Sequence, residues 1–374
     1  MLDLKGEREM KKNVYLDHAA TAPLSKSVQG QLDVLYTMYY NASSAYGFGA
    51  YNKMVVENVR KKIADMINAE PEEIIFTSCG SEANALAIDG FLKANEGFEA
   101  VCSNIEHASI LKNPNIKNII KCDSNGLINP DDLENIKNSL ISVMMVNNEI
   151  GTEQPIKQII EIAHKNGNIV HTDAVQAFGK IKIDVKYMDL DMMSVSGHKI
   201  GSARGVGFLY VKKGIKIAPI IYGEQENELR GGTYNDFAIK TLGLAVDDID
   251  YKIEDVLTSR RNYLLDKLLD IDGVHLNGSI FNRIASNINI RINNIGVDAQ
   301  QLVALLDESG FQVSAGSACH AGDPAPSYVL KAIGLTDDEA SHSIRITIGA
   351  ENTLEDLDRF VECLTGIVNM YKVN

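Results

Sequence analysis

The 374-residue chain lacks the features that mark several common classes of protein. Its five cysteines are scattered without a Cys-x-x-Cys pair, which argues against a disulfide framework and against a zinc site. It has 36 basic and 50 acidic residues, so its formal net charge is −14. Such a chain lacks the basic face with which proteins bind nucleic acid, although a small basic pocket for an anion is still possible. Its apolar runs are shorter than the roughly 18 residues that span a bilayer.

The first twelve residues, MLDLKGEREMKK, are charged and contain no apolar segment of the kind found in a secretory signal. We therefore expect a short extension before a fold that begins near Val14, and a protein of the reducing cytoplasm. In that compartment one of the cysteines could be a reactive thiol. The length suits one large domain or two, with enough chain for a sizeable core.

Short apolar runs alternate with helical segments over residues 70–215. A repeated β-α-β order predicts a mostly parallel sheet with helices on both faces. Near Asp250 the pattern changes to helices that alternate with a few short strands, which predicts a smaller α+β region. The sequence therefore predicts an α/β fold with a large domain of residues 15–250. A smaller domain would contain residues 1–14 and 251–374.

Polar residues recur at the points where the predicted strands end. The stretch at residues 192–199, MMSVSGHK, ends a strand with Lys199, which burial and nearby cations could turn into a nucleophilic amine. Ligands of such sheets bind beyond the carboxyl ends of the strands, so we expect the polar side chains there to converge on one site. The other residues at strand ends are Ser81, His107, Asn148, Asp173 with Gln176, and Ser196 with His198.

Each of these residues also has an ordinary structural explanation. Lys199 could be one of many surface lysines, and Ser81 could be the N-cap of a helix after a βα turn. His107 could be a loop histidine with satisfied hydrogen bonds. Asp173 could cap a helix, and Arg345, on a later apolar strand, could form a structural ion pair. Their joint occurrence at successive strand ends is less easily explained in this way.

The residue types match the needs of a pyridoxal phosphate site. Such a site needs a lysine for covalent attachment and a carboxylate at the pyridine nitrogen, which Lys199 and Asp173 supply. A flat side chain, here His107, can stack on the ring. Arg345 can bind a substrate carboxylate through two parallel hydrogen bonds. The phosphate could be bound by Ser81 at its helix N-terminus, Ser196 and His198.

Several longer stretches, taken together and in order, resemble one family. They are YLDHAAT at 15–21, VNNEIG at 146–151, HTDAVQ at 171–176, SGHK at 196–199, RGGT at 230–233, GSAC at 316–319, PSYVL at 326–330 and SIR at 343–345. They resemble the cysteine desulfurases of the class V aminotransferase group, which have the fold type I of pyridoxal-phosphate enzymes. The resemblance covers nearly the whole chain and implies an aspartate-aminotransferase-like architecture.

The resemblance implies a role for individual residues. Lys199 would bond covalently to pyridoxal 5′-phosphate and move the protons of the reaction, and His107 would stack on the ring and assist proton transfer. Asp173 would pair with the pyridine nitrogen, and Gln176 would contact the phenolic oxygen of the ring. The phosphate would be bound by Gly80, Ser81, Ser196 and His198, and by Thr233 from the second subunit.

The resemblance also implies the reaction and its partners. Arg345, with Asn148 and Asn41, would bind the carboxylate of L-cysteine, and Cys319 would accept its sulfur as a persulfide while L-alanine leaves. The role of Thr233 implies a homodimer with shared sites. An acceptor or iron–sulfur scaffold protein would take the sulfur onward, and no metal, nucleic acid or membrane is implied. Taken alone, Cys319 could equally be a small buried apolar residue.

Two alternatives and three departures stay open. The chain could be a selenocysteine lyase or another class V enzyme, or it could bind the cofactor without turnover as a sulfur carrier or scaffold. Cys79 stands where the family commonly has glycine, either as a packing residue or as a second thiol near the cofactor. Ala42 and Tyr46 replace a common proline and histidine beside Asn41. The segment 223–229 is more acidic than the family pattern.

Overall fold

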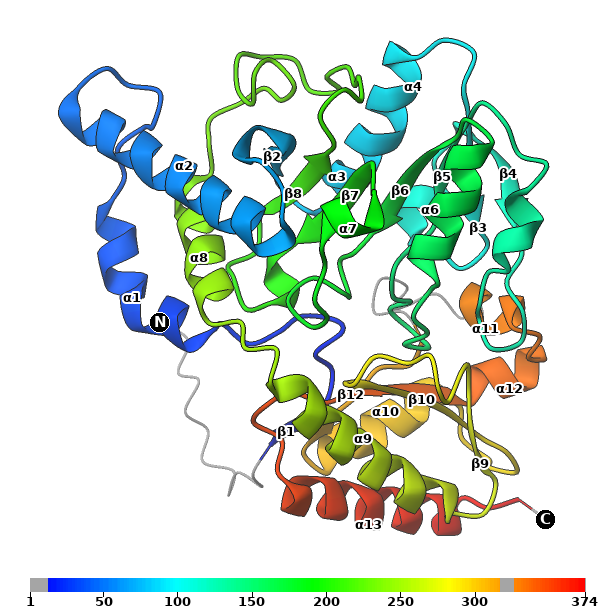
Figure 1. Cartoon of the computed structure of the whole chain (residues 1–374). Helices are drawn as coiled ribbons and strands as arrows, with labels where there is room; N and C mark the ends of the chain where they lie inside the picture. The colour runs from blue at the N-terminus through cyan, green and yellow to red at the C-terminus, as the bar shows by residue number, and fades with distance from the viewer. Residues whose placement is uncertain (1–12, 317–325, 374) are drawn as a thin grey trace.

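The structure is a computed structural model that describes residues 13–316 and 326–373 (Figure 1). Seven strands form one sheet in the order β2-β8-β7-β6-β5-β3-β4. Strand β8 pairs antiparallel with both neighbours, and the other four neighbouring pairs are parallel. The predicted mostly parallel α/β sheet is therefore confirmed. The strands are β2 (Ile74–Thr77), β3 (Glu99–Ser103), β4 (Ile116–Ile120), β5 (Ser139–Ser142), β6 (Ile169–Asp173), β7 (Met192–Ser196) and β8 (Gly207–Val211).

Helices cover both faces of this sheet because successive strand residues point to opposite sides. Ile74 and Phe76 pack into one apolar cluster with α2 (Gly47–Ile67), α6 (Ile156–Lys165) and α8 (Asp236–Asp247). Ile75 between them belongs to a second cluster on the other face. That cluster includes the continuous helical segment of α3 (Gly80–Ala85), the π-helical turn η2 (Leu86–Gly90) and α4 (Phe91–Ala94).

The sequence of α6 illustrates why these helices form. Its buried residues are Ile156, Ile159, Ile160 and Ala163, spaced three and four apart, so they make one apolar stripe along the helix. Basic residues His164 and Lys165 in the last turn suit the negative end of the helix dipole. The stripe faces the sheet, and the polar side of the helix faces solvent.

The C-terminal part of the chain has its own core beneath the large sheet (Figure 1). Its three-stranded antiparallel sheet has the order β12-β10-β9. A separate parallel pair joins β1 to β11, so the first described strand packs against the C-terminal region. The predicted domain boundaries at residues 14/15 and 250/251 stay a prediction. The elements are β1 (Val14–Tyr15), α9 (Ile253–Leu269), β9 (Val274–Leu276), β10 (Asn287–Ile292), α10 (Ala299–Glu308), β11 (Phe311–Gln312), α11 (Tyr328–Ala332), α12 (Asp337–Ser341), β12 (Ser343–Thr347) and α13 (Leu354–Met370).

One expected strand is shorter in the structure. The apolar run 141–146 predicts a strand to Val146, but β5 ends at Ser142. The chain still follows β6 beyond that point, because the Val143 and Met145 N–H groups donate to carbonyls of β6. The intervening Met144 N–H donates instead to the Glu106 carboxyl, which replaces a neighbouring strand at this position.

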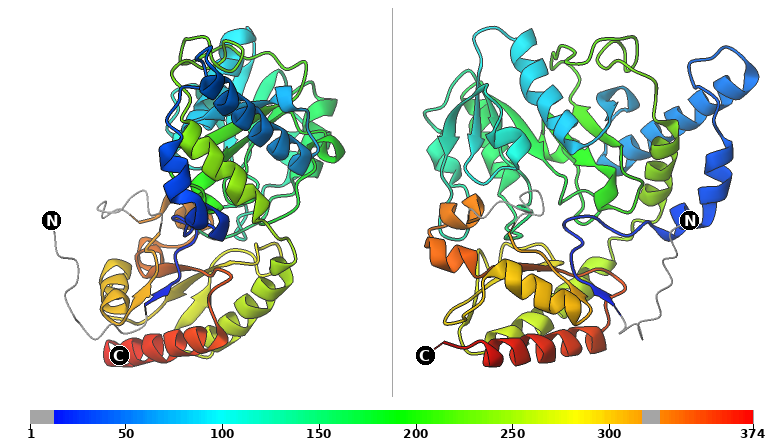
Figure 2. Two further views of the ribbon diagram at one scale, coloured as in Figure 1. Left: turned by 90° about the vertical axis from the view of Figure 1, so that its left-hand side faces the viewer. Right: turned by 180° about the vertical axis from the view of Figure 1, so that it is seen from behind.

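The facing ends of helices α1 (Lys26–Thr37) and α2, with the connection between them, form a segment that stands away from the rest of the molecule (Figure 1 and the right-hand view of Figure 2). Aromatic side chains on this segment are mostly in solvent. We call it the aromatic arm and define it by Tyr36, Tyr39, Tyr46, Phe48 and Tyr51, each more than half exposed. Among the described residues, no helix is long and apolar enough to cross a membrane.

Candidate functional site

A cavity of about 240 Å³ lies at the carboxyl ends of the parallel strands, where the predicted site residues converge. Its size suits one small ligand. Asn41 and Thr233 do not line it: both are exposed, and Asn41 accepts a hydrogen bond from the Ser43 N–H. Cys319 lies outside the described residues. The predicted residues that line the cavity are Gly80, Ser81, His107, Asn148, Asp173, Gln176, Ser196, His198, Lys199 and Arg345.

Lys199 enters the cavity from the short turn η4 (Gly197–Lys199), directly after β7. Every residue of β7 is buried, so the strand delivers the lysine from a rigid position. The Lys199 ammonium donates to the carbonyl oxygens of Ala19 at 2.6 Å and Ala20 at 2.8 Å. The lysine is therefore an interior group of the cavity, as expected from its place after the strand.

Asp173 ends the neighbouring strand β6 and is 4% exposed. Its carboxylate accepts hydrogen bonds from the Val175 N–H at 2.9 Å and from the Asn84 amide at 2.8 Å. Within the described residues it forms no ion pair. A buried carboxylate that lacks a cation is costly, so this site favours a ligand that brings a positive charge or a strong donor.

Asn84 was not predicted as a site residue, although it lies in the predicted loop-to-helix segment. Besides Asp173 it contacts the Ser109 hydroxyl at 3.0 Å, and its own side-chain oxygen is buried without a hydrogen-bond partner in the described structure. An amide between two alanines, Ala83 and Ala85, was the available signal. Its partners come from two other segments, which the local sequence does not reveal.

The segment around Gly80 forms the end of the cavity where small residues meet. A Cβ on Gly80 would lie 2.8 Å from Val175 Cγ2 and 3.3 Å from Ser196 Cβ, so a side chain there would collide with the cavity wall. The segment is anchored by Glu82, which accepts from the Ser78 N–H at 2.8 Å and pairs with Arg230 at 2.9 Å. Glycine at this point lets backbone approach a ligand closely.

Two titratable side chains near this end have shifted pKa values. Burial tends to raise the pKa of Glu82, but the hydrogen bonds from Arg230 and Ser78 outweigh burial and lower it. Burial and the nearby Lys199 cation lower the pKa of His198 to about 4. His198 is therefore a neutral ring at pH 7, with Nδ1 3.1 Å from the Thr21 hydroxyl.

His107 caps the short helix α5 (Ala108–Leu111). Its Nδ1 accepts from the Ser109 N–H at 3.1 Å and lies 2.8 Å from the Ser109 hydroxyl. Because Nδ1 accepts a backbone hydrogen bond, the proton of the neutral ring is on Nε2. These contacts fix the plane of a ring that lines the cavity.

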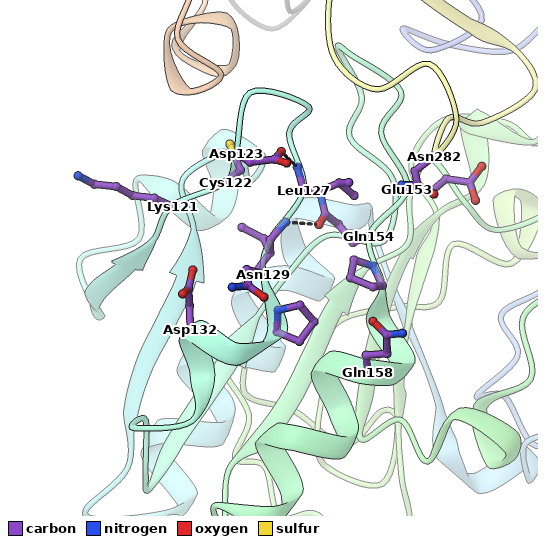
Figure 3. A pocket seen from close by; sticks show the side chains of 13 residues that line it. Lys121, Cys122, Asp123, Leu127, Asn129, Asp132, Glu153, Gln154, Gln158 and Asn282 are labelled. Carbon is purple, nitrogen blue, oxygen red and sulfur yellow. Dashed lines mark hydrogen bonds between the residues drawn. The ribbon is translucent and has the colours of Figure 1, made fainter.

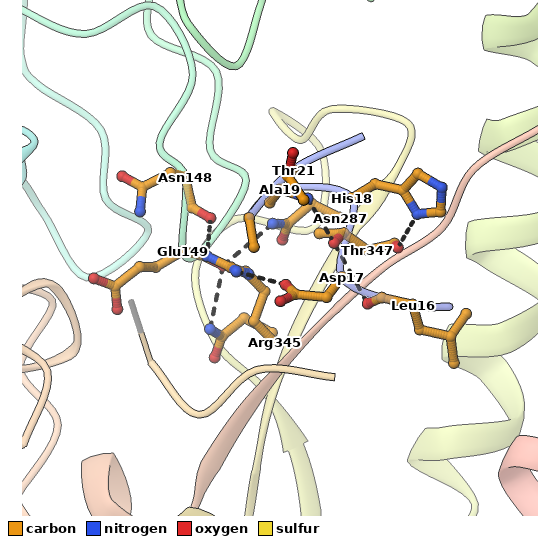
Figure 4. A network of polar contacts seen from close by, with 12 residues as sticks. Leu16, Asp17, His18, Ala19, Thr21, Asn148, Glu149, Asn287, Arg345 and Thr347 are labelled. Atoms are coloured by element: carbon orange, nitrogen blue, oxygen red, sulfur yellow. Dashed lines mark hydrogen bonds and ion pairs between the residues drawn. The ribbon is translucent and has the colours of Figure 1, made fainter. Parts of the chain in front are cut away.

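Arg345 forms the opposite wall and is 1% exposed (Figure 4). One guanidinium nitrogen pairs with the Asp17 carboxylate at 2.7 Å, and another donates to the Asn148 carbonyl at 3.0 Å. The structural ion pair considered for Arg345 thus exists, and Arg345 lines the cavity as well. In the described residues the Arg345 Nε and the Asn148 side-chain oxygen are buried without partners. A further polar ligand could satisfy them.

A second cavity, of about 810 Å³, contains none of the predicted site residues (Figure 3). It is lined mainly by the segments 121–132 and 153–158, with a hydrogen bond from the Ile128 N–H to Gln154 across it. Burial raises the pKa of its Cys122 thiol to about 11, so that thiol is protonated at neutral pH. This cavity is therefore not the candidate reactive site, although it is larger than the first one.

Comparisons with known proteins agree with this geometry. Residues 14–360 match the family described as Aminotransferase class-V. Cysteine desulfurase IscS of Methanosarcina thermophila is 40% identical, covering 96% of this chain and 92% of the relative. The protein of that name in Dictyoglomus turgidum is 39% identical, covering 96% and 95%.

Solved structures show the same similarity. A NifS-like protein from Rickettsia africae superimposes with a TM-score of 0.86 at 32% identity, over 96% of this chain and 99% of that one. A structure of SspA in complex with cysteine superimposes with a TM-score of 0.78 at 33% identity, over 89% and 98%.

Proposed function

The chain belongs to the class-V aminotransferase family, and on that premise we propose that it is a pyridoxal-phosphate-dependent cysteine desulfurase. It converts L-cysteine to L-alanine and transfers the sulfur to Cys319. The observation that carries the proposal is that Lys199 and Asp173 lie at the ends of adjacent strands and line the same cavity, with Arg345 on the facing wall. Relatives that bear the name cysteine desulfurase over almost the full length support it.

The residues around the cavity fit pyridoxal phosphate. Asp173, buried without a cation in the described structure, suits a protonated pyridine nitrogen, and the fixed His107 ring suits stacking. Lys199 is the amine that bonds to the cofactor. When bound, the cofactor supplies an electron sink that lowers the cost of removing the α-proton of an amino acid. Its phosphate would be bound by Gly80, Ser81, Ser196 and His198.

The chain's own groups then orient the substrate and move its protons. Arg345 binds the cysteine carboxylate and so directs the Cα–H bond toward Lys199, whose amine removes the proton. The Cys319 thiolate attacks the substrate sulfur, so an S–S bond forms as the Cβ–S bond breaks. The electron pair of the broken bond stays with the three-carbon fragment of the substrate. Protons returned through Lys199 and His107 complete L-alanine, and Cys319 is left as a persulfide.

A second copy of the chain completes the site in this proposal. Asn41 and Thr233 are exposed and outside their own chain's cavity, where they are available to a partner's site. The aromatic arm exposes several large side chains close together, and such a patch on a soluble fold favours a protein contact. Phe48→Asp in the arm should shift the dimer toward monomer in light scattering, whereas the control Phe281→Asp, on an exposed side chain elsewhere, should not.

In the cell, we place the reaction in the cytoplasm, and a sulfur acceptor or iron–sulfur scaffold protein then removes the persulfide sulfur. The acidic segment 223–229 does not act simply as a surface patch, because Glu226 is 5% exposed and pairs with Arg60 at 2.7 Å. That pair anchors the segment internally, so its exposed residues are the ones available to a partner.

The decisive test is incubation of the protein with L-cysteine and a reductant. We expect sulfide and alanine in equal amounts, and Cys319→Ala should retain the visible absorption of the bound cofactor but lose turnover of cysteine. Absence of stoichiometric alanine would refute the desulfurase. A parallel assay with L-selenocysteine separates the alternative: turnover of selenocysteine alone would make the chain a selenocysteine lyase.

A further inference from the structure

A chain of hydrogen bonds runs behind the cavity from Lys180 to Lys199. The Lys180 ammonium donates to the Gln176 side-chain oxygen at 2.9 Å. The Gln176 amide nitrogen donates to the Ala19 carbonyl at 3.0 Å, and the same carbonyl accepts from Lys199 at 2.6 Å. Gln176 is 5% exposed and lines the cavity, so bulk water does not replace these partners.

Lys180 and the Ala19 carbonyl together fix which end of the Gln176 amide faces each of them. In its ammonium form a lysine has three donors and no acceptor, so the amide oxygen points toward it. The two ends of an amide have nearly the same shape, and packing alone does not distinguish them. With its oxygen held by Lys180, Gln176 can only donate on the cavity side.

The backbone holds Lys180 in place for this contact. Lys180 follows Gly179, which has a φ of 75°. A Cβ on Gly179 would lie 2.8 Å from Ile200 Cγ2 and 2.9 Å from Ile249 Cδ1. Glycine is therefore needed both for the left-handed conformation and for close packing, and the turn delivers Lys180 to Gln176.

We propose that Lys180 is a positioning residue that makes Gln176 a hydrogen-bond donor to the phenolic oxygen of the bound cofactor. The inference rests on the proposed function. A donor at that oxygen stabilises its anion and draws negative charge away from the nitrogen that Lys199 contributes, which lowers the pKa of that nitrogen. A lower proton affinity of the Lys199 nitrogen favours exchange of Lys199 for the amine of the substrate.

Lys180 is half-buried, and its ammonium lies near two other cations. Burial, with the Lys199 and Arg345 cations nearby, lowers the pKa of Lys180 to about 7. The Gln176 oxygen is the acceptor that favours the ammonium form in this setting.

The test measures the holoenzyme without substrate, by following the absorption of the bound cofactor as pH is varied. The midpoint of that change reports the proton on the Lys199 nitrogen. We expect Lys180→Met to raise the midpoint by about one pH unit, since a donor and a nearby charge are both lost. Lys180→Arg, which can only donate, should stay close to the wild type. The matched control Lys182→Met, two positions away and exposed, should leave the midpoint unchanged.

A double-mutant cycle separates the hydrogen bond from the charge of Lys180. If Lys180 acts through Gln176, Gln176→Met should raise the midpoint by itself, and adding Lys180→Met should then change it little. Fully additive shifts would overturn the inference, because they would show that Lys180 acts by charge alone. An unchanged midpoint in Lys180→Met would overturn it as well.

Folding and cofactor content must be matched for these comparisons, by circular dichroism and by absorbance per subunit. If Lys180→Met does not fold, Lys180→Gln replaces it, because a glutamine can donate or accept and should give an intermediate midpoint. A wild-type protein that binds no chromophore would overturn both the proposed function and this inference. A bound chromophore whose midpoint ignores Lys180 would overturn the inference alone.

Discussion

The two walls of the cavity are built in different ways. The sheet wall, defined by Asp173, Gln176 and Lys199, comes from the ends and following turns of the adjacent strands β6 and β7. The Arg345 wall joins Arg345 to Asp17, which is 328 positions away in the chain, and to Asn148. One wall is assembled locally from consecutive motifs, and the other is assembled by the tertiary fold.

The walls also differ in how their charges are balanced. In the described structure, Asp173 of the sheet wall has hydrogen-bond donors but no cation, whereas Arg345 already has a carboxylate partner at 2.7 Å. The sheet wall therefore gains most from a cationic group in the ligand. A substrate carboxylate at the Arg345 wall has to share the guanidinium with Asp17, so this wall selects the ligand by geometry more than by net charge.

The largest expected effect concerns the sheet wall. Lys199→Ala removes the covalent attachment point and the base together, so kcat/KM for L-cysteine should fall by about 10⁴-fold or more. The assay measures alanine and sulfide. Lys182→Ala serves as an exposed control. In the wild type, borohydride reduction and peptide mapping should find the cofactor on Lys199, and a label on another lysine would refute this role.

The next effect concerns the Arg345 wall. Arg345→Lys keeps the charge but loses the planar fork that binds a carboxylate, so kcat/KM should fall by about 10²- to 10³-fold, mainly through KM. The absorption of the bound cofactor should stay as in the wild type, because the sheet wall is intact. A changed absorption with unchanged KM would show that the two walls are not separable in this way.

The same contrast explains how much the sequence could predict. The α/β sheet followed from alternating apolar runs and helices, and the sheet wall followed from polar residues at strand ends, because parallel strands bring their ends to one edge. The sequence alone therefore predicts that Lys199, Asp173 and Gln176 lie together. Their predicted chemical roles remain predictions.

Contacts between distant segments could not be predicted. The Asp17–Arg345 pair and the buried Arg60–Glu226 pair join residues 328 and 166 positions apart, and no local pattern encodes such pairing. Glu226, in the segment that is more acidic than the family pattern, is buried, with a left-handed φ of 51°. Asn41 and Thr233 were predicted for the site, yet one chain alone does not bring them to its own cavity.

A third prediction concerns a substitution that removes the carboxylate partner of Arg345. Asp17→Asn leaves the buried Arg345 guanidinium without its carboxylate, so the free energy of unfolding should fall by about 2 kcal/mol, allowing for the partial exposure of Asp17. Addition of L-alanine, whose carboxylate can take the vacated position, should stabilise this variant more than the wild type. Urea unfolding with and without L-alanine measures both, and Asp33→Asn is the exposed control. Equal stabilisation of variant and wild type would contradict a shared guanidinium.

The smallest effect, per pH unit, concerns a carboxyl group behind the sheet wall, Glu106, which is fully buried just after β3. It accepts from the Ser103 hydroxyl and from the Met144 N–H at 2.8 Å, and in the described structure its second oxygen has no partner. Burial raises the pKa of Glu106 to about 8, from an ordinary value of 4.5. Unlike Asp17, it has no ion-pair partner among residues 13–316 and 326–373 to stabilise the ionised form.

Stability should therefore depend on pH through Glu106. Between about pH 4.5 and 8 the folded protein keeps this proton and the unfolded chain releases it, so the Glu106 contribution to stability falls as pH rises, by up to about 1.4 kcal/mol per unit. Glu106→Gln cannot ionise and keeps an acceptor for Ser103 and Met144. The free energy of unfolding of the variant, relative to that of the wild type, should therefore rise by up to about 1.4 kcal/mol per pH unit. Urea unfolding at pH 5.5, 6.5 and 7.5 measures this difference. Glu99→Gln, exposed at the start of β3, should not change relative to the wild type over this range. Equal pH slopes for wild type and Glu106→Gln would mean that Glu106 is ionised in the fold, with a cation or water at its second oxygen.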